Sequence, residues 1–68
     1  MSDTASRLIE LAEDRLRVAD GLGLSVAGLV GLVYSSVDDG DHEKACEHLE
    51  AIDKLINEAR LRAEGAKE

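Results

Sequence analysis

The stretch GLGLSVAGLVGLVYSSV, residues 21–37, decides the fold of this chain, because it carries no charge while the sequence on both sides is dense with charge. Such a run is normally buried, since moving apolar surface out of water is the main favourable term in folding. A membrane-spanning helix needs about 20 apolar residues. This run has 17, includes four glycines and three serines, and lies between Asp20 and Asp38. We expect a buried helical segment of a soluble protein, with a small single-span membrane protein of the phage-holin type as an alternative.

The chain has 68 residues, which allows one domain, residues 1–68, with a small core. Small domains usually gain further stability from disulfides, a metal or oligomerisation. Cys46 is the only cysteine, so an internal disulfide is excluded. His42 and Cys46 would supply only half of a four-ligand zinc site. We therefore expect no metal and no cofactor, and we expect the missing burial to come from association of two copies.

The composition predicts an all-α protein, because proline is absent and only one residue is aromatic. Apolar residues follow one another at spacings of three and four along the first half, which is the pattern of a helix that packs along one seam. The seam predicts one long helix over residues 4–37. Glycine costs about 1 kcal/mol relative to alanine inside a helix, so Gly21 and Gly23 leave an alternative of three short helices with a break near residues 20–23.

The segment Asp-Asp-Gly-Asp, residues 38–41, predicts a turn. Gly40 can adopt the positive φ of a tight connection, and Asp39 or Asp41 can cap the following helix. The last helix is expected over residues 42–65 and ends at Gly65. Residues 1–3 and 66–68 are expected to be frayed ends.

A turn this short makes the two helices antiparallel neighbours. The first helix would then extend past the second and leave its early apolar residues uncovered. Two such hairpins could bury the surplus by forming a four-helix bundle, so we predict a homodimer. The predicted dimer interface and core comprise Leu8, Ile9, Leu11, Leu16, Leu22, Gly23, Val26, Ala27, Leu29, Val30, Gly31 and Val33.

Two details of the pattern bear on that interface. Gly23, Ala27, Gly31 and Ser35 are spaced by four, so they predict a stripe at which two helices approach closely. Arg15 is the polar member of the seam. In the hairpin it lies level with residues 63–64, so we expect it to pair with Glu64 or with an acid of the second copy.

The formal net charge is −7, with most of the excess acid after residue 37. An acidic surface repels phosphate, and the chain lacks a basic stripe, so we expect no direct binding of nucleic acid. An acidic surface can instead meet a basic patch of another protein. The candidates for partner binding are Glu43, Glu47, Glu50, Asp53, Glu58 and Tyr34.

No arrangement of a nucleophile with a base presents itself, so we expect no enzyme and no catalytic residues. The polar, acidic start of the chain does not resemble a signal peptide, which predicts a cytoplasmic protein. The chain is similar in kind to small regulators encoded by bacteria and phages, including anti-activators and anti-defence proteins, although no motif carries this likeness. The predicted function is protein–protein binding as a regulator, inhibitor or adaptor. An inhibitor that mimics nucleic acid with its carboxylates is the alternative.

Overall fold

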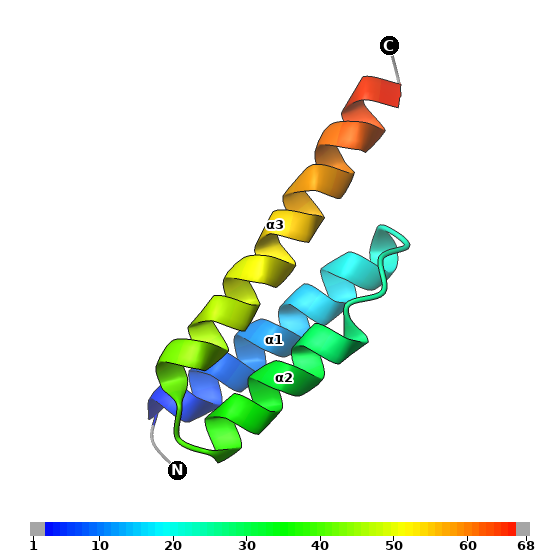
Figure 1. Ribbon diagram of the computed structural model, residues 1–68. Helices are drawn as coiled ribbons and strands as arrows, with labels where there is room; N and C mark the ends of the chain where they lie inside the picture. The colour runs from blue at the N-terminus through cyan, green and yellow to red at the C-terminus, as the bar shows by residue number, and fades with distance from the viewer. Residues whose placement is uncertain (1–2, 67–68) are drawn as a thin grey trace.

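The computed structural model describes residues 3–66 and confirms the all-α prediction. Helix α1 spans Asp3–Gly21, α2 spans Ala27–Asp38 and α3 spans His42–Ala66. Helices α1 and α3 run in the same general direction and α2 runs in the opposite direction (Figure 1). Each helix packs against the other two. The result is a three-helix bundle about 46 Å long and 17–18 Å across.

The break between α1 and α2 decides between the two predicted architectures. A helix continuous over residues 4–37 is not present, and the alternative of three helices is the one that the structure has. The Leu24 N–H donates to the carbonyl oxygen of Ala19 at 2.8 Å, and the Gly23 N–H donates to that of Asp20 at 3.1 Å. These two bonds, with Gly23 at φ +75°, form the glycine cap that ends many helices. The four-helix bundle of two hairpins therefore loses its basis, because α1 folds back onto its own chain.

The predicted turn between α2 and α3 is present and also contains a glycine cap that ends the helix before it. Gly40 has φ +78°, and the Asp41 N–H donates to the carbonyl oxygen of Ser36 at 2.9 Å. Of the two predicted caps, Asp41 is the one observed, since its carboxylate accepts a bond from the Lys44 N–H at 3.1 Å. Asp3 and Ala66 are helical where frayed ends were expected. The rest of those predicted ends, 1–2 and 67–68, lies outside the described residues.

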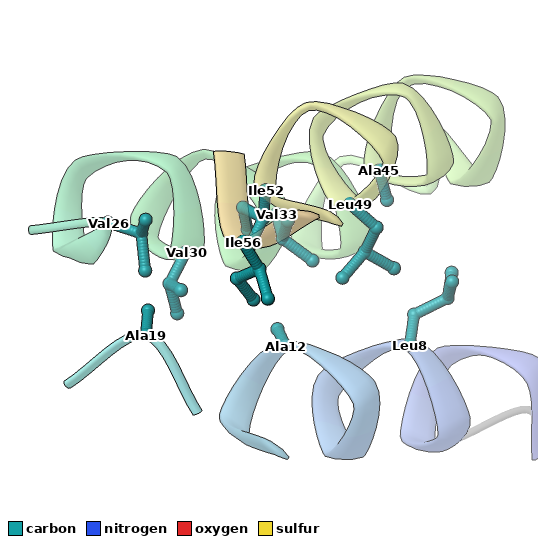
Figure 2. Packing of buried hydrophobic residues seen from close by; sticks show 10 residues of the cluster. All are labelled: Leu8, Ala12, Ala19, Val26, Val30, Val33, Ala45, Leu49, Ile52 and Ile56. Atoms are coloured by element: carbon teal, nitrogen blue, oxygen red, sulfur yellow. The ribbon is translucent and has the colours of Figure 1, made fainter. Parts of the chain in front are cut away.

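The core lies along the axis of the bundle and is made by all three helices. Figure 2 shows the α1 side chains pointing toward those of α2 and α3. Leu8, which the hairpin left uncovered, is only 6% exposed because α1 packs against its own chain. Leu22 is the seam residue that leaves the core, since it lies in the α1–α2 loop. The cluster comprises Leu8, Ala12, Ala19, Val26, Val30, Val33, Ala45, Leu49, Ile52 and Ile56.

Helix α3 extends past the α1–α2 loop, as Figure 1 shows at the C-terminal end of the ribbon. Its side chains at residues 60–65 are all exposed. The uncharged stretch that opened the sequence is divided between the end of α1, the loop and α2. Within residues 3–66, no helix combines the length and the hydropathy that a membrane crossing requires.

Candidate binding surfaces

The first candidate site is a row of carboxylates on α3. Glu43, Glu47 and Glu50 are exposed, and their spacings of four and three place them on one face of the helix. None of the three forms an ion pair within residues 3–66. We call these three residues the acidic surface. The turn adds exposed Asp38, Asp39 and Asp41 at the same end of the molecule.

The other predicted partner-binding residues are less available for binding than the three glutamates of the acidic surface. Asp53 is exposed but forms an ion pair with Arg15 of α1, which turns it toward the neighbouring helix. Glu58 is half-buried, and Tyr34 is 39% exposed on α2. The acidic surface is therefore narrower than the predicted set.

The second candidate site is the exposed side of α2, which we call the α2 outer face and define by the exposed residues Ala27, Gly28, Gly31, Leu32, Tyr34 and Ser35. Helix α2 carries no charge before Asp38. Leu32 is 47% exposed and Tyr34 is 39% exposed. An exposed apolar face that no charged side chain interrupts is a candidate interaction surface.

The two glycines of this face have no role in the packing of the chain itself. A Cβ atom added to Gly28 or Gly31 would meet nothing within 4 Å. Neither residue has a positive φ, in contrast to Gly23 and Gly40. Each glycine in a helix interior costs about 1 kcal/mol relative to alanine. Within the described chain, no contact compensates for that cost.

The N-terminus of α2 lacks a side-chain cap, and the charge at its C-terminus is unfavourable to the helix dipole. Val26 is the N-cap residue and provides no side-chain cap, and the first turn contains no acid. Asp38 instead lies at the C-terminal end, where a negative charge opposes the helix dipole. An acid is thus present at the end of α2 where it is unfavourable and absent from the end where it would be favourable.

A shallow groove of about 210 Å³ lies between α1 and α3, lined by Arg15, Val18, Asp53, Ile56 and Arg60. Pockets for drug-sized ligands are typically about 300–1,000 Å³, so the groove is small. Its only aspartate is already paired with Arg15. The groove therefore offers no obvious site for a substrate.

Cysteine and histidine side chains do not assemble a metal site in residues 3–66, because no group of three or more ligand-type side chains comes together there. Cys46 is free and exposed on α3, and His42 is half-buried. They remain the half-site that the sequence indicated.

The predicted dimer residues do not form one surface. Leu8, Val26, Val30 and Val33 are core residues of a single chain, while Ile9, Leu11, Leu16 and Leu29 are half-buried. Only Leu22, Gly23, Ala27 and Gly31 are exposed, and the first two lie in the loop. Gly28 and Leu32 are also exposed on α2, although neither was in the predicted interface. Their position outside the apolar seam is the signal that predicts this exposure.

No protein-family model, curated protein or solved structure matches this chain.

Proposed function

We propose that this is a non-enzymatic cytoplasmic protein that binds a basic protein through its acidic surface and acts as a regulator, inhibitor or adaptor. The observation that carries the proposal is the exposure of Glu43, Glu47 and Glu50 on one helix face with no ion pair within the described chain. A free thiol at Cys46 fits a reducing compartment.

Charge explains why such a row favours a basic partner. Aligned carboxylates that are not neutralised by neighbours create a negative potential, which steers a positively charged patch and fixes its orientation on contact. The three aspartates of the turn extend this potential. Binding through exposed charges weakens with salt because the charges are screened over about 10 Å at 0.1 M ionic strength.

We further propose that the protein acts as a homodimer. The α2 outer face leaves Leu32 and Tyr34 exposed. A chain of 68 residues has only a small core of its own. Association that covers this face would add apolar burial without involving the acidic surface.

Charge reversal tests the proposed binding. We expect the variant Glu43→Lys, Glu47→Lys and Glu50→Lys to lose the basic partner that wild-type protein captures from cells that carry the gene, as measured by affinity capture and mass spectrometry. Loss is expected because the attraction becomes repulsion.

The matched control reverses three exposed acids of α1 in Glu10→Lys, Glu13→Lys and Asp20→Lys. This control has the same net charge as the test variant and should retain the partner. Capture that is equal for both variants and wild type would contradict a role for the acidic surface.

A nucleic-acid mimic is the second candidate function. It is favoured by the exposed aspartates of the turn, which lie at the same end of the molecule as the acidic surface, although exposed Lys44 lies among these acids in the sequence. A mimic occupies the site that its target uses for nucleic acid. Duplex DNA or RNA should then displace the captured partner, whereas a partner bound elsewhere would stay bound when nucleic acid is added at constant salt.

A further inference from the structure

We propose that a second copy of this chain covers the α2 outer face, with the two α2 helices antiparallel across a two-fold axis near Gly31 and Leu32. This inference rests on the homodimer of the proposed function and names its interface. It does not depend on the basic partner. Three features of α2 support it: the absence of charge before Asp38, the state of the two helix ends, and the presence of both large and small residues on the exposed side.

Charge identifies a second copy as the occupant. Two chains of net charge −7 repel each other. The α2 outer face carries no charged residue, so it allows two copies to approach with the least repulsion. A basic partner would gain nothing from this face and would be drawn to the acidic surface instead. An uncharged and partly apolar face on an acidic protein is therefore best suited to its own copy.

The ends of α2 favour the antiparallel arrangement. In such a pair, Asp38 of each chain lies beside the N-terminus of α2 of the other chain. That N-terminus has no side-chain cap and no acid in its first turn. A carboxylate near a helix N-terminus is favourable, whereas the same carboxylate at its own helix C-terminus is unfavourable. One antiparallel contact thus improves both ends of both helices.

The sizes of the exposed residues are complementary in the same arrangement. With the axis between Gly31 and Leu32, the Leu32 side chain lies opposite Gly31 of the partner subunit, and Gly28 lies opposite Ser35 of the partner subunit. A large side chain then meets a residue without one, and the two backbones can approach closely. This contact gives Gly28 and Gly31 a role, which the packing within one chain does not provide.

Glycine substitution provides a test, because it should weaken the dimer while it stabilises the single chain. We expect Gly28→Ala together with Gly31→Ala to raise the dissociation constant of the dimer by at least about tenfold, measured by sedimentation equilibrium, because added methyl groups separate the helices. At concentrations where the chain is monomeric, the same variant should melt at a higher temperature than wild type, since alanine is the better helix former.

The matched control is Gly65→Ala, an exposed helical glycine of α3 where an added Cβ also meets nothing within 4 Å. It should leave the dissociation constant unchanged. A double alanine variant of α2 that dimerises as well as wild type would overturn the proposed interface.

Cross-linking provides a second measurement that does not depend on stability. In a Cys46→Ser background, Leu32→Cys lies next to the proposed axis and should form an intermolecular disulfide under mild oxidation. Glu13→Cys, an exposed position on α1, should not. Asp38→Asn should weaken the dimer, because it removes the charge that faces the partner subunit's helix N-terminus.

The outcomes separate this inference from the proposed function. A chain that stays monomeric at every accessible concentration would overturn both the homodimer and this interface. A dimer that forms without the Leu32→Cys cross-link would overturn the interface alone. Loss of partner capture by the Glu43, Glu47 and Glu50 variant, with dimerisation intact, would support the binding function whichever surface joins the copies.

Discussion

Ile52 and Leu61 are large apolar residues of the same helix, yet their exposure to solvent is very different. Ile52 is fully buried, whereas Leu61 is 67% exposed. Replacing a buried isoleucine by alanine removes apolar contacts and leaves a cavity, at about 2–5 kcal/mol. We expect Ile52→Ala to lower the free energy of unfolding by that amount in urea titrations followed by circular dichroism. Leu61→Ala should change it by no more than about 0.5 kcal/mol. Similar effects at both positions would contradict the observed placement of α3.

Arg15 shows what could and could not be predicted for a single residue. As the polar member of the apolar seam, Arg15 was expected to reach the surface and to pair with an acid. The expected partner was Glu64 or an acid of a second copy, and the observed partner is Asp53 of the same chain. The reason is the direction of the helices, since α1 and α3 run in the same sense (Figure 1). The ion pair with Asp53 places Arg15 beside the middle of α3 instead of its end. The direction of α1 depends on the loop at residues 22–26, which the residue type of Arg15 does not reveal.

The helix ends set the direction of each element, and Gly23 is the residue that reverses the chain after α1. Gly23 has φ +75°, at which an alanine would be strained. Gly21 is the last residue of α1 and lacks a positive φ, so an alanine there would not be strained. We expect Gly23→Ala to lower the free energy of unfolding by about 1 kcal/mol or more. Gly21→Ala should leave it unchanged or raise it slightly. Thermal denaturation of the two variants provides the comparison, and equal melting temperatures would contradict a left-handed conformation at Gly23.

The helical character of the chain was predictable, but the connection between the first two helices could be given only as an alternative to one continuous helix. The turn at Gly40 was recognised because three aspartates surround the glycine. Gly23 makes the same cap, but its neighbours are apolar, so the sequence there resembles a helix interior. The seam also passes from Ala19 to Val26 without a change of phase. Both residues are in the core, and a five-residue loop that returns the chain to the core preserves that spacing as well as a helix would. Periodicity alone cannot distinguish these two cases.

The net charge of −7 acts on the whole molecule, because like charges held close together in the folded state repel one another. We expect the urea midpoint of unfolding to rise when salt is increased from about 0.01 M to about 1 M, where the screening length falls from about 30 Å to about 3 Å. Each glutamate-to-lysine change alters the charge by two, so the triple variant at residues 43, 47 and 50 has a net charge of −1. Its midpoint should respond less. A salt response of equal size in both proteins would show that self-repulsion is not the cause.

The path of the chain through three helices places the start of α1 and the end of α3 at opposite ends of the bundle (Figure 1). Tension applied between Asp3 and Ala66 would therefore act along the helix axes. Under such a load α3 must slide past α1 and α2, so the core contacts between the helices must break at the same time. A two-helix hairpin has both ends on the same side and would unzip one turn at a time. We therefore expect the bundle to resist a pulling force between Asp3 and Ala66 better than such a hairpin would.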